Sequence, residues 1–189
     1  MGEITKDELD AAVEGQTIAS RFLDTVAAHG DVVALRWKGP DGDFEELTYR
    51  EYADQVASAA AWLRSKGIGP GDRIVLMMRN IPEFHVLDLG AVFLGATPIS
   101  IYNSSSPDQI AFLVGHSKAV LAVVEDDGFA SRFEPVRADL PALREVVTLS
   151  HPGVREEILG TPGVDLATSC RDCGPDTLAT VIYTSGTTE

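Results

Sequence analysis

The sequence predicts an α/β domain in which helices flank a mostly parallel sheet, with a small β-hairpin near the N-terminus. Strand and helix patterns alternate along almost the whole chain, which is typical of repeated strand-helix-strand units. Several predicted strands are continuous apolar runs, and such runs are expected when helices cover both faces of a sheet. A cluster of turn-forming residues at 39–43 separates two short strand patterns and indicates the hairpin.

The first predicted helix spans residues 17–28, where apolar side chains recur at helical spacing, and Gly30 ends the pattern. A strand pattern follows at 32–37 and another at 44–47. The sequence between them, Gly-Pro-Asp-Gly-Asp, favours a tight turn. These two strands are therefore predicted to pair with each other as a hairpin.

A second helix follows the hairpin and has the clearest signals in the sequence. Thr48 and Glu51 have the spacing of a capping box, and Gly67 is placed to end the helix. Its apolar face is formed by Ala53, Val56, Ala57, Ala60 and Leu63. The glycine-containing residues 68–72 are predicted to form a turn into the next strand.

The rest of the chain continues the alternation of strands and helices. The predicted strands of the sheet span residues 74–78, 97–101, 119–124, 145–149 and 179–183. Helices are predicted at residues 80–95, after a capping signal at Ser106, and at residues 129–138. The polar residues 150–175 contain several prolines and glycines and are predicted to form a long connection.

The charge of the chain argues against some classes of partner. Lys and Arg number 15 against 29 Asp and Glu, so the formal net charge is -14 and opposes binding to a phosphate backbone. The N-terminus lacks the basic start and apolar run of a signal peptide, and no stretch approaches the roughly 20 apolar residues of a membrane span. We therefore expect a cytoplasmic protein that does not bind nucleic acid. Peripheral contact with a membrane stays open.

Neither the cysteines nor the histidines have the spacing of a metal site. Cys170 and Cys173 lack a second pair or suitably spaced histidines, so they are interpreted as thiols of a connecting loop. The histidines are scattered, and each is interpreted as a surface or structural residue. They are His29, His85, His116 and His151.

The last residues of the chain carry the strongest chemical signal. An apolar strand pattern at 181–183 is followed by small, mostly hydroxylic residues, namely Thr184, Ser185, Gly186, Thr187 and Thr188. Such a loop can present N–H groups and hydroxyls to an anion at the carboxyl end of a strand, where open α/β sheets bind ligands. The lysine and second glycine of a Walker loop are absent. From the residues alone, a phosphate-binding loop and a solvated turn both stay open.

Several segments resemble one known family. The phosphate-loop signature of the adenylate-forming (AMP-binding) superfamily begins with a sequence similar to Tyr-Thr-Ser-Gly-Thr-Thr at residues 183–188. This superfamily includes acyl-CoA synthetases, luciferases and the adenylation domains of peptide synthetases. Further segments similar to the family lie at residues 47–52, 67–75, 80–84 and 90–99. Because their order and spacing also agree, the chain is identified as a member of this superfamily.

The resemblance also implies an activity. Residues 101–110, Ile-Tyr-Asn-Ser-Ser-Ser-Pro-Asp-Gln-Ile, are similar to the long-chain fatty acyl-CoA synthetase type. Such enzymes use ATP and Mg2+ to activate a long-chain fatty acid as acyl-AMP, and then transfer the acyl group to coenzyme A. The resemblance implies that residues 184–188 hold the phosphates and that Thr184 helps to hold Mg2+. Tyr183 is expected to pack at the strand end, and no catalytic residue is assigned.

The resemblance stops inside the phosphate loop. Relatives have glycine and then a run with proline and lysine after this point, whereas this chain has Glu189. We therefore expect residues 1–189 to be the N-terminal part of the large AMP-binding domain, inactive alone and with apolar edges exposed. Two alternatives stay open: a non-catalytic relative that acts by protein association, and an enzyme that adenylates another carboxylic acid. Homo-oligomerisation also stays open.

Overall fold

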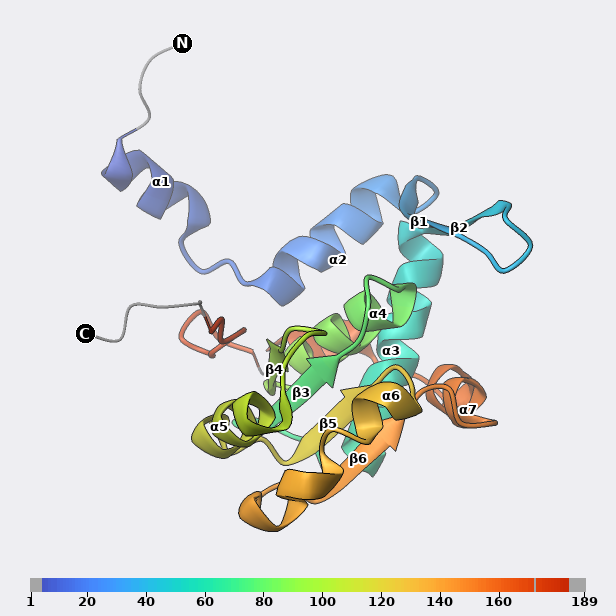
Figure 1. Ribbon diagram of the computed structural model, residues 1–189. Helices are drawn as coiled ribbons and strands as arrows, with labels where there is room; N and C mark the ends of the chain where they lie inside the picture. Colours follow the sequence, from blue (N-terminus) through green and yellow to red (C-terminus); the bar gives the residue numbers. More distant parts are fainter. Residues whose placement is uncertain (1–4, 172, 184–189) are drawn as a thin grey trace.

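The computed structural model describes residues 5–171 and 173–183, and it confirms the predicted α/β architecture. Four parallel strands form the sheet in the order β4-β3-β5-β6 (Figure 1). Their bounds are β3 (Arg73–Met77), β4 (Thr97–Ser100), β5 (Leu121–Val124) and β6 (Glu145–Thr148). The chain thus places β4 on one side of β3 and then crosses to the other side for β5 and β6.

Helices cover both faces of this sheet. One face packs against α3 (Tyr49–Ser65) and α4 (Pro82–Val92), and the other against α5 (Pro107–Ser117) and α6 (Asp127–Ala130). The helix α2 (Ile18–His29) packs against α3 and α4 and extends the core on the first face. Successive side chains of a strand point to opposite faces. Ile74 and Leu76 accordingly belong to the first of two cores, and Val75 and Met77 to the second. This is why the strand reads as one continuous apolar run.

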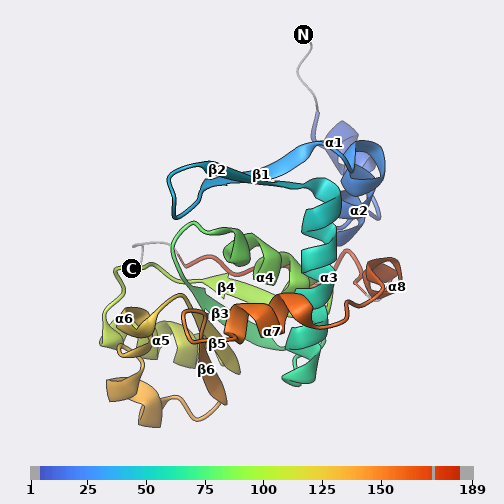
Figure 2. The same cartoon turned by 90° about the vertical axis from the view of Figure 1, so that its right-hand side faces the viewer.

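The hairpin is also present as predicted. Strands β1 (Val33–Lys38) and β2 (Phe44–Thr48) pair antiparallel, and Gly42 takes a φ of 90° in the turn between them. Figure 2 shows the hairpin extending away from the end of α3, above α4 and separate from the parallel sheet.

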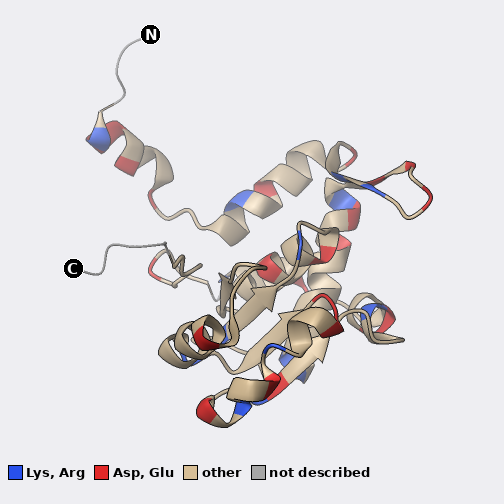
Figure 3. Cartoon of the chain, viewed as in Figure 1, with Lys and Arg blue, Asp and Glu red and all other residues tan. Residues whose placement is uncertain are grey.

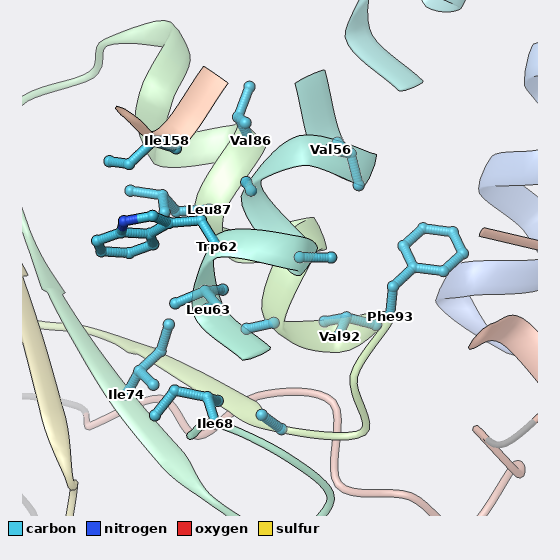
Figure 4. Packing of buried hydrophobic residues seen from close by; sticks show 14 of the residues in the cluster. Val56, Trp62, Leu63, Ile68, Ile74, Val86, Leu87, Val92, Phe93 and Ile158 are labelled. Atoms are coloured by element: carbon cyan, nitrogen blue, oxygen red, sulfur yellow. The ribbon is translucent and has the colours of Figure 1, made fainter. Parts of the chain in front are cut away.

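The first core is centred on the contact between α3 and α4. Trp62 and Leu63 of α3 are almost fully buried, and they lie among side chains of α4, the sheet and α7 (Val154–Gly160) (Figure 4). The two helices approach closely at Gly90, where an added Cβ would lie 3.1 Å from the backbone nitrogen of Ala60. A side chain at this position would therefore force α3 and α4 apart.

Charged residues lie mostly on the helices, the loops and the hairpin, and the strands of the parallel sheet are almost free of them (Figure 3). This distribution agrees with a sheet that is buried on both faces. None of the helices in the described ranges combines the length and the apolar character that a membrane span requires.

The predicted capping box of α3 is present. The Oγ1 of Thr48 accepts from the N–H of Glu51 at 3.3 Å, and the N–H of Thr48 donates to the Glu51 carboxylate at 2.8 Å. Loss of an N-cap side chain typically costs about 1 kcal/mol. We therefore expect Thr48→Ala to lower the free energy of unfolding by about 1 kcal/mol, measured by urea denaturation. Thr25→Ala, in the interior of α2, is the matched control and is expected to cost less; an equal loss in both would contradict a capping role.

The predicted helix at residues 129–138 is wrong. The structure has two short elements there, α6 (Asp127–Ala130) and a 3-10 helix, η1 (Glu134–Asp139). Pro135 lies inside the predicted span and has no N–H for the hydrogen bond of an α-helix. The chain therefore bends between the two pieces and buries Phe129 and Phe133 in the second core.

The predicted long connection at residues 150–175 is also wrong in part, because it contains α7 and α8 (Leu166–Arg171). Both are short, and each buries an apolar residue, Ile158 or Leu166, in the first core. Such helices depend on tertiary packing more than on their own propensity. Cys170 therefore lies in a helix and not in a loop, and Cys173, which follows it, is buried. The helix α1 (Lys6–Val13) was not predicted, although Thr5 and Glu8 form a capping box at its start.

Candidate functional site

The predicted phosphate loop, residues 184–188, lies outside the described residues, so its role stays a prediction. The chain that leads into it is described, and there the predicted strand at 179–183 is wrong. The segment runs beside β4 without forming a ladder. Along β4, Thr97 and Ile101 donate their N–H groups to the β3 side, so Pro98 and Ser100 face the outer edge. Pro98 has no N–H, which removes one of the two donors that a ladder on this edge could use.

Side-chain hydroxyls attach this segment to β4 instead. The Oγ1 of Thr97 donates to the carbonyl of Leu178 at 2.9 Å, and the Oγ1 of Thr180 donates to the carbonyl of Pro98 at 3.3 Å. These contacts advance in the same direction along both segments, so the chain runs parallel to β4. It therefore travels toward the carboxyl end of the sheet, the edge at which α/β proteins bind ligands.

Tyr183 is the last described residue and is held by α5. Its side chain packs against the second core, as expected, and its hydroxyl lies 2.8 Å from Nδ1 of His116. The ring of His116 is stacked on Phe112, with centroids 5.6 Å apart and an interplanar angle of 22°. His116 is exposed, as predicted for a surface residue, but its contact with Tyr183 was not foreseen.

A hollow of about 400 Å³ opens beside Tyr183. Its wall is formed by the loop after β4, by α5 and by Tyr183 itself, and it combines aromatic, aliphatic and polar side chains: Tyr102, Ser104, Ser105, Asp108, Gln109, Phe112, Leu113 and Tyr183. The loop is fixed by a buried Ser105, whose carbonyl accepts from Arg132 Nη1 at 3.4 Å. The hollow thus combines apolar surface with several hydrogen-bonding groups next to the start of the predicted loop.

The strand order reverses between β3 and β5, and the carboxyl ends of the strands at such a point commonly bind ligands. Here Arg79 pairs with Glu125 and Asp126, and its guanidinium lies 5.1 Å from the ring centre of Phe129. Hydrogen bonds from Arg79 to Glu125 and then to Asp126 raise the pKa of Arg79. A phosphate could use this charge only after breaking both ion pairs.

Metal binding is not tested by the described residues. Within residues 5–171 and 173–183, no group of three or more His, Cys, Asp or Glu side chains is placed to hold a metal ion. Thr184, the predicted Mg2+ ligand, lies outside this part of the chain.

A half-buried carboxylate, Asp88 in α4, was not predicted as a notable residue. Within the described part of the chain it makes no hydrogen bond or ion pair, and burial raises its pKa to about 6. The pKa of Tyr52 is also raised, first by burial and then by the charge of Asp88. The available signal was a single acidic residue in the otherwise apolar sequence Val-Leu-Asp-Leu-Gly-Ala-Val.

Comparisons with known proteins give one consistent result. Residues 22–188 match the family model described as AMP-binding enzyme. The chain is 32% identical over 154 residues to the long-chain-fatty-acid–CoA ligase FadD15 of Mycobacterium bovis, covering 78% of this chain and 26% of that protein. It is 30% identical over 183 residues to acetyl-coenzyme A synthetase of Pseudoalteromonas atlantica, covering 86% of this chain and 28% of that protein. The chain thus spans about a quarter of the length of these relatives.

A solved structure shares the fold. The Mycobacterium tuberculosis fatty acyl CoA synthetase superimposes with a TM-score of 0.76 at 23% sequence identity. The match covers 89% of this chain and 32% of that protein. The architecture described above is therefore that of the corresponding part of a much longer chain.

Proposed function

Because the chain belongs to the AMP-binding enzyme family, we propose that residues 1–189 are the N-terminal part of the large domain of an ATP-dependent acyl-CoA synthetase. The match of residues 22–188 to the family model carries this proposal, since it spans nearly the whole chain. The course of residues 178–183 supports it further, because they bring the chain to the ligand-binding edge of the sheet.

The proposed reaction joins a carboxylate oxygen of the acid to the α-phosphorus of ATP, with pyrophosphate as the leaving group. The thiol of coenzyme A then attacks the acyl carbon and releases AMP. N–H groups and hydroxyls of Thr184, Ser185, Gly186, Thr187 and Thr188 would hold the phosphates, and Thr184 would help to hold Mg2+. Magnesium would neutralise charge on the phosphates during the transfer. No catalytic acid or base is assigned to the described residues.

For the acid, we propose a long-chain fatty acid. The sequence of residues 101–110 supports this choice, and FadD15 is named for that substrate class. The match to acetyl-coenzyme A synthetase, which covers more of this chain, favours acetate as the second candidate. Peripheral membrane contact and homo-oligomerisation would belong to the whole enzyme.

The proposal is tested by pyrophosphate release. ATP, Mg2+ and carboxylic acids from acetate to palmitate are supplied to the 189-residue chain and to the longest protein that its gene encodes. We expect release with the long protein, fastest with the long acids, and none with the 189-residue chain. A variant with Thr184, Ser185 and Thr187 replaced by alanine is the control and is expected to lose activity without loss of thermal stability.

Each other outcome is informative. Release that is fastest with acetate would contradict the long-chain assignment and support the second candidate. Release by the 189-residue chain itself would contradict its inactivity. If neither protein released pyrophosphate with any acid, the enzyme assignment would be contradicted, and a non-catalytic protein that acts by association would be favoured.

A further inference from the structure

The contact between His116 and Tyr183 is the last one that the described chain makes before the predicted phosphate loop. We propose that His116 is a positioning residue for this loop: by holding the Tyr183 hydroxyl, it fixes the backbone from which residue 184 begins. The inference rests on the proposed function, because it takes residues 184–188 as the loop that binds the phosphates of ATP.

The geometry joins two parts of the chain that are distant in sequence. Nδ1 of His116 and the hydroxyl of Tyr183 lie 2.8 Å apart, although 67 positions separate the residues. The two rings meet edge to face, with centroids 5.7 Å apart and an interplanar angle of 80°. Consecutive Cα atoms are only 3.8 Å apart in a trans peptide, so the restraint on Tyr183 acts one peptide unit before the predicted loop.

Phe112 restrains the imidazole from its other side. It lies one helical turn before His116 on α5, the spacing at which side chains on one helix face meet. Its ring is stacked on the imidazole, yet Phe112 as a residue is 63% exposed. The stack thus limits rotation of the imidazole and keeps Nδ1 directed toward Tyr183.

Residues 178–183 form no ladder with β4, so the contact between His116 and Tyr183 contributes a larger share of what holds this segment. A regular strand would be held by a backbone hydrogen bond at every second residue. Residues 178–183 are attached by the Thr97 and Thr180 hydroxyls, by packing of Val181 and Tyr183, and by His116. Of these attachments, the bond from His116 is nearest to the loop. One hydrogen bond of ordinary net strength corresponds to about a two- to twelve-fold change in an equilibrium constant.

The test separates the hydrogen bond from the stack. H116F keeps an aromatic ring beside Phe112 and removes the hydrogen bond, Y183F removes only the hydroxyl, and H116N keeps a polar group near the position of Nδ1. Binding of ATP is measured by calorimetry without acid, in the longest protein that the gene encodes. The KM values for ATP and acid and the value of kcat are measured in parallel. H151F is the matched control, because His151 is also exposed but pairs with Asp127.

We expect H116F and Y183F each to weaken ATP binding about three- to ten-fold, with the KM for the acid unchanged. The double variant should bind ATP no more weakly than either single variant, because both remove the same bond. H116N should recover most of the affinity, and H151F should match the unaltered protein.

Equal ATP affinity in H116F, Y183F and the unaltered protein would overturn the inference. A double variant whose loss of ATP affinity equals the sum of the two single losses in free energy would also overturn it. ATP binding with the expected variant pattern but no pyrophosphate release with any acid would contradict the proposed function and support the inference. A protein that binds no ATP would overturn both.

Discussion

Replacing Trp62 with alanine is expected to lower the free energy of unfolding by about 3–5 kcal/mol, the range observed when large aromatic core residues are truncated. Trp62 is 1% exposed and lies at the contact of α3 with α4 and α7. Its Nε1 also donates to a carboxylate oxygen of Glu157 at 2.9 Å. The variant therefore leaves both a cavity and a carboxylate without its donor. Urea denaturation followed by far-UV circular dichroism measures the loss.

Two further variants separate the loss of the hydrogen bond to Glu157 from the loss of core packing, and compare the core with the hairpin. Trp62→Phe removes the donor to Glu157 and keeps most of the ring, so we expect a loss of about 1–2 kcal/mol. Trp37→Ala is the control, because Trp37 is only half-buried on the hairpin, outside the two cores. If Trp37→Ala were as damaging as Trp62→Ala, the stability of the chain would not be centred on the contact between α3 and α4.

Replacing Asp88 with asparagine is expected to stabilise the chain by about 2–3 kcal/mol at pH 8 and to have little effect at pH 4. Burial raises the pKa of Asp88 to about 6 in the folded state, against an ordinary value of 3.8. Between these values the folded state binds more protons than the unfolded state, so stability falls as the pH rises and then levels off above about pH 6. A difference of about two pKa units corresponds to about 3 kcal/mol.

Urea denaturation at pH 4, 5, 6, 7 and 8 gives the difference between Asp88→Asn and the unaltered chain at each pH. Groups that titrate equally in both proteins cancel from this difference. Asp54→Asn is the control, since Asp54 is an exposed carboxylate on the neighbouring helix α3. A difference for Asp88→Asn that stays constant from pH 4 to pH 8 would show that Asp88 titrates alike in the folded and unfolded states.

The order of strands and helices could be predicted because its signals are local. The capping box of Thr48, the turn at residues 39–43 and the apolar runs of β3 and β5 depend on neighbouring residues only. Pro135 is also a local signal, because it lacks the N–H that a continuous α-helix over residues 129–138 would need at that position.

The candidate site was predictable only in part. The small hydroxylic residues after Tyr183 and their similarity to one family identified residues 184–188, which the described residues do not test. Neither periodicity nor spacing could place His116 beside Tyr183, because the contact joins α5 to a segment 67 positions away. The partial burial of Asp88 was also not predictable from local sequence, since a neighbour such as Tyr52 comes from another helix, α3.

By itself, the sequence determined the fold class, the hairpin, the two-sided burial of the strands and the family. These follow from hydrogen bonding, capping and hydrophobic periodicity within short stretches of chain. Only the tertiary structure decided the strand order β4-β3-β5-β6, the side-chain attachment of residues 178–183 to β4, and the raised pKa of Asp88. Each of these depends on contacts between distant segments, and their energies arise only when the chain has packed.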